Sequence, residues 1–270
     1  MNHKIAFFGA GNMGGAVIEA IVSKKVAKPS DVIIFDKYLP AAEKFAEKFG
    51  TVVAKSIADA AESADVWVIA VKPNVVPSLL KELKKHVDSR KIIVSIAAGV
   101  KVSTFVSLLG EDIKLVRTIP NMPAMVGEGL TGIYFFNMEN DEFIVKIFDS
   151  CGKSIVVSKE NMIDEMIPVT SSSPAYVCMM VEAMADAAVK AGFQRKDAYV
   201  MAEQAILGTA KLMLERNIHP AVLKDQICSP GGTTIEAVIS LEKTGFRSSL
   251  ELAMEACSDK VKALDKGASK

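Results

Sequence analysis

A glycine-rich motif near the N-terminus has the residue types and the spacing that suit phosphate binding. It reads Gly9-Ala10-Gly11-Asn12-Met13-Gly14, follows an apolar run at residues 4–8 and precedes a helical pattern at residues 16–22. In a turn from strand to helix, the first glycine permits the tight bend, the second lets the backbone approach a pyrophosphate, and the third lets the helix pack closely on the strand. The phosphates then lie on free N–H groups at the helix N-terminus. The motif therefore predicts a dinucleotide site; the alternative is a glycine-rich turn that binds nothing.

An acidic residue supports the dinucleotide interpretation. Asp36 ends the second expected strand, at residues 32–35, and stands about 20 residues beyond the last glycine of the motif. A carboxylate at this place accepts hydrogen bonds from the adenosine ribose hydroxyls and repels a 2′-phosphate. We therefore expect NADH to be favoured over NADPH, with the neighbouring Lys37 softening the discrimination. The alternative is an aspartate that only terminates the strand.

Composition and charge exclude several other classes of protein. The chain has 270 residues, of which 50% are hydrophobic, enough for a sizeable core and twice the length of a typical domain. Lys plus Arg and Asp plus Glu both number 32, which argues against a dedicated nucleic-acid-binding protein. The uncharged stretch at residues 166–181 contains two prolines and four Ser or Thr residues, so we expect no membrane span. The N-terminus shows no secretory signal.

Cysteine and histidine usage predicts neither disulfides nor a metal site. Cys151, Cys178, Cys228 and Cys257 are far apart and form no C-x-x-C pair, so we expect buried or partly buried free thiols. The three histidines have no other plausible ligand near them in the sequence, and a zinc site is not expected. This usage agrees with a cytoplasmic protein.

The elements that must position the glycine loop alternate between strands and helices. Apolar runs predict strands at residues 4–8, 32–35, 66–71, 92–96 and 114–117, with further strands at 131–136 and 154–157. Helical patterns lie between them, for example at residues 40–49. The run at 66–71 is wholly apolar, as expected for a strand that is covered on both faces. The alternation predicts an α/β domain with a doubly wound parallel sheet.

The sequence changes character after residue 158, which divides the chain into an expected dinucleotide-binding domain, 1–158, and a helical domain, 159–270. Helices are predicted at residues 174–191, 197–214, 220–227, 233–241 and 249–264, so the second half should be all-α. Thr233 and Glu236 have the spacing of a capping box, with the threonine at the N-cap. The methionines on the long helices are expected to pack in a core or at a subunit interface.

Four further sequence blocks, taken in order with the glycine loop, carry a resemblance to a known family. They are Ala70-Val71-Lys72-Pro73, the block Ser95 to Val100 (SIAAGV), the block Arg117 to Ala124 (RTIPNMPA), and Ser229-Pro230-Gly231-Gly232-Thr233-Thr234. Over essentially the whole chain, this pattern closely resembles pyrroline-5-carboxylate reductase. The resemblance implies reduction of 1-pyrroline-5-carboxylate to L-proline with NADPH or NADH, the last step of proline biosynthesis. It also implies an N-terminal Rossmann-type domain followed by an all-α dimerisation domain, with dimers often assembling into decamers.

The same resemblance assigns roles to residues of this chain. Besides the glycine loop and Asp36, it places these residues at the cofactor: Val71, Lys72, Pro73, Ile96, Ala98, Asn121 and Gln226. It places these residues at the substrate: Glu160, Ser229, Gly231, Gly232, Thr233 and Thr234. The glycines leave backbone N–H groups accessible and Thr233 opens a helix, whose positive end favours the substrate carboxylate. Thr234 is expected to hydrogen-bond the ring nitrogen and is the one catalytic residue proposed.

Some features leave alternatives open. Thr170-Ser171-Ser172-Ser173-Pro174 has serines where many relatives alternate serine with glycine, so residue roles in that stretch are not carried over. Lys72 is alternatively a solvated lysine, and Arg117 a structural ion-pair partner. Two rival functions are a β-hydroxyacid dehydrogenase, whose helical lysine motif is missing here, and a non-catalytic NAD(H)-binding sensor, which would have no reason to keep the blocks at residues 70–73 and 229–234.

Overall fold

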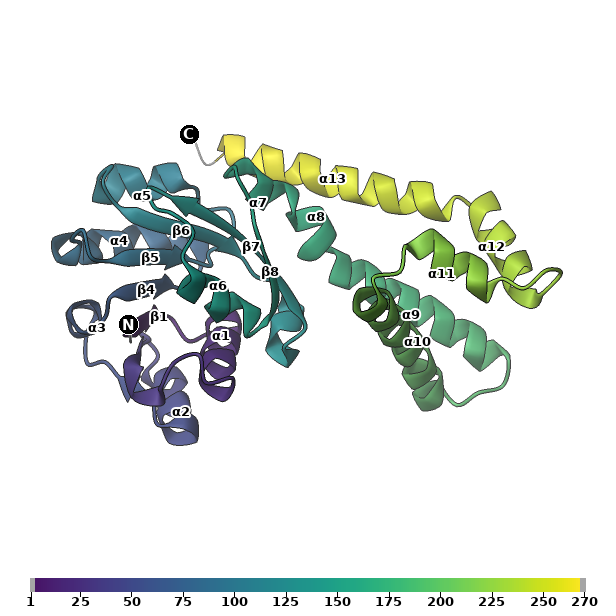
Figure 1. Cartoon of the computed structure of the whole chain (residues 1–270), viewed down its shortest axis with the longest axis horizontal. Helices are drawn as coiled ribbons and strands as arrows, with labels where there is room; N and C mark the ends of the chain where they lie inside the picture. The colour runs from purple at the N-terminus through teal and green to yellow at the C-terminus, as the bar shows by residue number, and fades with distance from the viewer. Residues whose placement is uncertain (1–2, 268–270) are drawn as a thin grey trace. The chain divides into compact units, whose positions relative to one another are not determined.

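The computed structural model describes residues 3–267, which form two compact units (Figure 1). The first unit runs to Ser171 and resumes at Ser258, within the last helix, and the second spans Ser172–Cys257. The first contains the sheet and the second is helical.

The first unit is built on an eight-stranded sheet with the order β3-β2-β1-β4-β5-β6-β7-β8. The strands are β1 (Ile5–Phe8), β2 (Val32–Phe35), β3 (Val52–Val53), β4 (Val66–Ile69), β5 (Ile92–Ser95), β6 (Lys114–Ile119), β7 (Gly129–Phe136) and β8 (Gly152–Val156). β6 pairs with β7 in antiparallel fashion, and the other neighbours pair in parallel. The prediction of a doubly wound parallel sheet is confirmed except for the antiparallel β6–β7 pair, and the strands expected at 131–136 and 154–157 extend the sheet.

Helices cover both faces of this sheet. They are α1 (Asn12–Ser23), α2 (Leu39–Phe49), α3 (Ile57–Ser63), α4 (Val76–Leu83), α5 (Val102–Leu109) and α6 (Glu142–Asp149), followed by the short helices α7 (Asn161–Glu165) and α8 (Ile167–Thr170). The short helical turns are η1 (Pro29–Asp31), η2 (Pro73–Val75), η3 (Lys84–His86) and η4 (Met122–Val126). The helix predicted at residues 16–22 begins earlier, at Asn12, within the glycine-rich motif and directly after Gly11.

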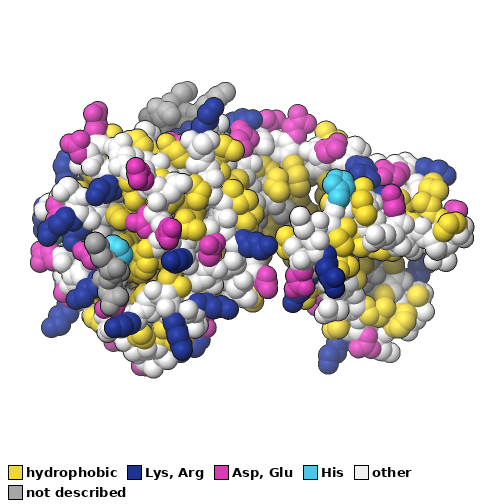
Figure 2. Space-filling model, viewed as in Figure 1, with side chains coloured by type: hydrophobic (Ala, Val, Ile, Leu, Met, Phe, Trp, Pro, Cys, Tyr) yellow, Lys and Arg dark blue, Asp and Glu magenta, His cyan; other side chains and the backbone are white. Residues whose placement is uncertain are grey.

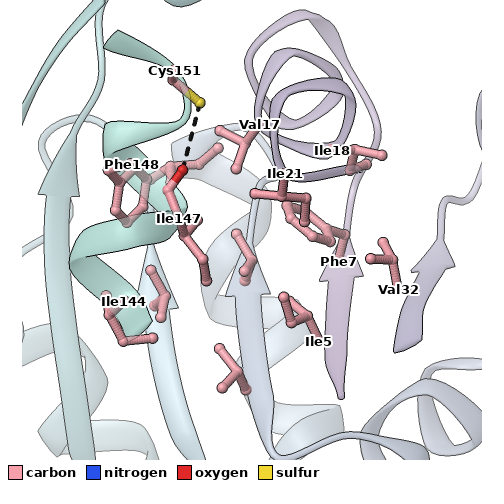
Figure 3. Close-up of a cluster of buried hydrophobic side chains, with 14 of the residues drawn as sticks. Ile5, Phe7, Val17, Ile18, Ile21, Val32, Ile144, Ile147, Phe148 and Cys151 are labelled. Carbon is pink, nitrogen blue, oxygen red and sulfur yellow. Dashed lines mark hydrogen bonds between the residues drawn. The ribbon is translucent and has the colours of Figure 1, made fainter. Parts of the chain in front are cut away.

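Two hydrophobic cores result from the alternation of side chains along the strands. Ile5 and Phe7 of β1 face α1 and α6, whereas Ala6 and Phe8 belong to the cluster on the opposite face. Figure 3 shows the first cluster, in which Ile144, Ile147 and Phe148 of α6 lie across from Val17, Ile18 and Ile21 of α1. All four β1 side chains are fully buried, so the strand that leads into the glycine loop is held from both sides.

The helical unit contains α9 (Ser173–Lys190), α10 (Arg195–Arg216), α11 (Pro220–Ile227), α12 (Thr233–Lys243) and the first part of α13 (Phe246–Gly267). The prediction of an all-α second half is confirmed for the described residues after β8. One local prediction is wrong. Gly232 rather than Thr233 is the N-cap of α12, and no side-chain cap bond forms, because the turn through Gly231 places Thr233 already inside the helix. The capping box is therefore not made.

The cysteines are unpaired, as predicted, but their burial differs from the expectation. Cys151 is buried, Cys228 and Cys257 are partly buried, and Cys178 is exposed on α9. Burial raises the pKa of the Cys151 thiol, which donates to the carbonyl oxygen of Ile147 across 3.8 Å (Figure 3). Among the described residues, we find no helix of the length and apolar character needed to cross a membrane.

Candidate active site

The glycine loop connects β1 to α1 and has the conformation that the motif predicts. Gly9 has a φ of +106°, and a Cβ there would lie 2.6 Å from the carbonyl oxygen of Ala70. A Cβ on Gly14 would lie 2.8 Å from the carbonyl oxygen of Gly9, which confirms the close packing of helix on strand. Gly11 differs from both: a Cβ there would have no heavy atom within 4 Å. The space beside Gly11 is therefore open to a ligand that approaches the backbone.

The N-terminus of α1 lies at this open space. Gly11 is its N-cap, no side chain caps the helix, and its first turn carries no acidic residue. The free N–H groups of a helix start and the positive end of its dipole both attract an anion. Asn12 is exposed and Met13 half-buried beside this start. A pyrophosphate suits the donors that the loop presents.

Asp36 lies beside the glycine loop. Its Oδ2 accepts a hydrogen bond from the Ala10 N–H across 2.7 Å, and its Oδ1 accepts one from the Tyr38 N–H across 2.8 Å. The side chain is half-buried. Both oxygens are thus fixed by backbone donors, and each retains capacity to accept a further bond. The sequence predicted the proximity of Asp36 to the loop, but not these two bonds.

The register of the sheet brings further predicted residues to the same edge. Phe8, which precedes the glycine loop, pairs with Phe35 on one side and with Ile69 on the other. Ile69 in turn pairs with Ser95. The carboxyl ends of β1, β2, β4 and β5 therefore coincide, which is where open α/β sheets bind their ligands. The residues that follow these ends are Asp36, Val71, Lys72, Pro73, Ile96 and Ala98.

These residues differ in exposure. Lys72, Pro73 and Ala98 are exposed, Val71 is half-buried and Ile96 is buried. The exposed side chain of Lys72 agrees with either a cofactor contact or a solvated lysine.

Asn121 is buried and its amide already has two protein partners. Its Nδ2 donates to the carbonyl oxygen of Thr170 across 2.8 Å, and its Oδ1 accepts from the Leu130 N–H across 2.9 Å. The side chain thereby links the end of β6 to β7 and α8. The structure gives Asn121 this linking role, and its contact with a cofactor stays a prediction.

Glu160 also has protein partners. Its Oε1 accepts from the Val102 N–H across 2.8 Å and from Arg117 Nη1 across 3.0 Å. Arg117 is buried and also pairs with Asp164, so the ion-pair alternative for this arginine is confirmed. Sequence reasoning missed Asp164. The available signal was its spacing of four residues from Glu160, which puts two acids on one face of a helix.

The helical unit holds the remaining predicted residues around the start of α12. Gly231 has a φ of +67°, which favours glycine, and the Gly232 N–H donates to the carbonyl oxygen of Ser229 across 3.0 Å. A Cβ on Gly232 would collide with the Ser229 side chain. Thr233 is exposed and Thr234 half-buried. Because no side chain caps α12, its first N–H groups remain available to an anion.

Gln226 lies in the helical unit near the end of α11 and is exposed. It belongs to a different unit from the glycine loop.

Two family models match this chain. One, described as pyrroline-5-carboxylate reductase dimerisation, matches residues 160–264, and one, described as NADP oxidoreductase coenzyme F420-dependent, matches residues 4–99. The first covers the helical unit and the second covers the strands that carry the glycine loop.

Curated relatives match over nearly the whole chain. The pyrroline-5-carboxylate reductase of Escherichia coli (strain K12) is 40% identical over 272 residues, covering 98% of this chain and 100% of its own length. That of Arabidopsis thaliana is 35% identical, covering 97% of this chain and 95% of its own length.

Solved structures agree. A pyrroline-5-carboxylate reductase from Coxiella burnetii superposes with a TM-score of 0.94 at 29% identity, covering 98% of this chain and 99% of its own. A Plasmodium falciparum pyrroline carboxylate reductase with NADP bound superposes with a TM-score of 0.83 at 30% identity, covering 98% of both chains.

Proposed function

Because this chain belongs to the pyrroline-5-carboxylate reductase family, we propose that it reduces 1-pyrroline-5-carboxylate to L-proline, the last step of proline biosynthesis, with a nicotinamide dinucleotide as reductant. One observation carries this proposal beyond the likeness. The glycine loop, Asp36 and the segments that follow β4 and β5 come together at one edge of the sheet, while α12 begins with uncapped N–H groups.

The residues at the sheet edge fit a dinucleotide. The open space at Gly11 and the uncapped start of α1 receive the pyrophosphate, and Asp36 receives the adenosine ribose. When bound, the cofactor supplies the hydride that reduces the C=N carbon of the substrate. We propose that NADH is the favoured form, because the Asp36 carboxylate repels a 2′-phosphate.

The nicotinamide end is assigned to the segments that follow β4 and β5. Val71, Lys72 and Pro73 follow β4, and Ile96 and Ala98 follow β5. Asn121 and Gln226 complete the proposed set of cofactor residues. Ile96 is buried and apolar, so the proposal gives it an apolar contact with the nicotinamide ring.

The substrate is an anion with a ring nitrogen, and the start of α12 offers groups for both parts. The N–H groups near Gly231 and Gly232 and the hydroxyls of Ser229 and Thr233 are proposed to hold the carboxylate. Thr234 is proposed to hydrogen-bond the ring nitrogen. These residues act by positioning and by electrostatics, and no histidine is assigned as a general acid. The resemblance adds Glu160 as a substrate contact.

Self-association follows from the dimerisation model that matches residues 160–264. The helical unit of a single chain exposes Val177, Met179, Met184, Val200, Met201, Leu207 and Leu212, and Figure 2 shows hydrophobic side chains on the visible surface of this unit. A groove of about 780 Å³ between α9 and α10 is lined mainly by apolar side chains, among them Val177 and Leu207. We propose that a second copy of the chain covers this surface, and that the resulting dimers assemble into decamers, as the resemblance implies. We also propose that the protein acts in the cytoplasm, because its free thiols favour a reducing compartment.

The direct test is an assay of the purified protein with 1-pyrroline-5-carboxylate. The reaction is monitored by the absorbance of the reduced cofactor, with NADH in one series and NADPH in another. We expect oxidation of the cofactor with equimolar formation of proline. A 3-hydroxy acid oxidised with NAD tests the β-hydroxyacid dehydrogenase alternative. Tight cofactor binding with no turnover of either substrate would favour the sensor alternative and refute the proposal.

A further inference from the structure

Arg117 is a buried cation placed next to the segment that follows β5. It lies on β6 and pairs in register with Ser95, the last residue of β5, and its side chain is 2% exposed. Burying an isolated guanidinium is costly unless carboxylates meet it. Glu160 meets its Nη1 across 3.0 Å, and Asp164 meets both terminal nitrogens, Nη2 across 2.5 Å and Nη1 across 3.2 Å. The three side chains form a fixed ionic cluster.

The Glu160 carboxylate connects this cluster to the start of α5. Its Oε1 accepts from the Val102 N–H across 2.8 Å as well as from Arg117. Val102 is the first residue of α5, where backbone N–H groups have no partner inside the helix. A carboxylate also suits the positive end of a helix dipole. Glu160 therefore holds the helix start against the buried arginine.

The six residues between β5 and α5, 96–101, are thereby held at both ends. At the β5 end, the Ile96 N–H donates to the carbonyl oxygen of Ile69 across 3.2 Å, and the Ala97 N–H donates to Ser95 Oγ across 3.3 Å. At the α5 end the anchor is Glu160. Between them, Gly99 has a φ of +73° and its Cβ position has no heavy atom within 4 Å. Ala97 and Val100 are buried in the core, and the Val100 N–H donates to the carbonyl oxygen of Ala97 across 3.5 Å, whereas Ala98 and Gly99 between them are exposed. The conformation of this exposed tip therefore depends on the residues that flank it, and Glu160 fixes the flank that leads into α5.

We propose that Glu160 is a positioning residue, which holds segment 96–101 in the conformation that receives the nicotinamide end of the cofactor. The inference rests on the proposed function for the contact of Ile96 and Ala98 with that end. It differs from the direct substrate contact that the resemblance implies for Glu160. Asp164 provides a matched control, because its hydrogen bonds go to Arg117 while Val102 is bound by Glu160.

The experiment compares binding of NADH with binding of ADP-ribose, which lacks the nicotinamide, in the full-length protein by titration calorimetry. Three variants are used: Glu160→Ala, Glu160→Gln and Asp164→Asn. Thermal unfolding of each variant is recorded in parallel, so that loss of structure is measured separately from loss of binding.

In Glu160→Ala the Kd of NADH should rise about tenfold, as for the loss of one anchoring hydrogen bond, while the Kd of ADP-ribose stays within about twofold. Glu160→Gln keeps an oxygen that accepts from the Val102 N–H, and its NADH Kd should return to within about threefold of wild type. Asp164→Asn should lower the Tm, because it weakens a buried ion pair, yet leave the NADH Kd within about twofold.

Three outcomes overturn the inference. Glu160→Ala with a wild-type NADH Kd and a raised KM for 1-pyrroline-5-carboxylate would assign Glu160 to the substrate instead. Equal weakening of NADH and ADP-ribose would mean a general loss of structure. An Asp164→Asn variant that loses NADH binding as strongly as Glu160→Ala would mean that the ion cluster, and not the anchor on Val102, decides the effect. The titrations use no imine substrate, so failure of the wild type to reduce 1-pyrroline-5-carboxylate refutes the proposed function separately.

Discussion

A methyl group at Gly11 should weaken cofactor binding without harming the fold. Gly11 has φ −68° and ψ −169°, a conformation that alanine adopts freely, and a Cβ there meets no heavy atom within 4 Å. Replacing glycine by alanine at such a position stabilises a protein by ~0.4–1 kcal/mol, because the unfolded chain loses conformational entropy. The Tm of Gly11→Ala should therefore equal or exceed that of the wild type.

The binding penalty follows from where that methyl group projects. It enters the open space beside the start of α1, where the pyrophosphate must approach the backbone. A hydrogen bond to a charged group contributes about 1.5–3 kcal/mol, so losing one phosphate contact should raise the Kd roughly 10- to 150-fold. The assay is a fluorescence titration with NADH alongside thermal unfolding.

Gly14→Ala is the matched control, because there the added methyl group should lower the stability of the fold. Its Cβ would lie 2.8 Å from the carbonyl oxygen of Gly9 and 2.9 Å from the Cβ of Ala70. Backbone cannot yield as a flexible side chain does, so we expect a loss of about 1–3 kcal/mol in unfolding free energy. Wild-type NADH affinity in Gly11→Ala would refute the assignment of this loop to the pyrophosphate, and an unchanged Tm in Gly14→Ala would refute the packing argument.

Three further changes test other parts of the proposal. Thr234→Ala should lower kcat/KM for 1-pyrroline-5-carboxylate by about 5- to 150-fold with little change in NADH affinity, because one hydrogen bond of ~1–3 kcal/mol is lost. Full activity of this variant would mean that another residue contacts the ring nitrogen. Met179→Glu puts a charge on an exposed apolar face of α9 and should shift the protein toward monomer in light scattering, whereas an intact oligomer would exclude this face from the interface. Asp36→Ser should narrow the preference for NADH over NADPH, measured as the ratio of the two kcat/KM values.

The sheet was predictable because its strands are short, apolar and buried on both sides. Residues 66–69 of β4 are fully buried, and the apolar run that revealed them is the direct consequence. The helices α3 to α6 were not predicted individually. They span only seven or eight residues each, too few for a 3.6-residue periodicity to stand out from neighbouring turns. Their existence was implied by the crossovers that parallel strands require.

The glycine loop was predictable and the ion cluster was not, for one physical reason. The motif is local: a single turn from strand to helix requires glycine at positions 9, 11 and 14, so the sequence alone reveals it. Arg117 and Asp164 are 47 residues apart, and only the tertiary structure brings them together. The prediction of the capping box was wrong for a different, local reason. Thr233 has the right type and spacing, but the turn through Gly231 begins the helix one residue earlier.

A test of Asp36 must separate its structural hydrogen bonds in the glycine loop from the effect of its charge on the choice of cofactor. Its carboxylate accepts from the Ala10 and Tyr38 N–H groups, so Asp36→Ser removes structural bonds along with the charge. Any loosening of the glycine loop acts on NADH and NADPH alike and cancels in the ratio of their kcat/KM values. What remains in the ratio is the interaction of the charge with the ribose hydroxyls or with the 2′-phosphate. Repulsion between two anions weakens as salt screens it, with a Debye length of about 10 Å at 0.1 M. The wild-type ratio should therefore move toward NADPH as ionic strength rises, whereas the ratio of the serine variant should change little. A wild-type ratio that favours NADPH at low salt would mean that Asp36 serves the loop alone.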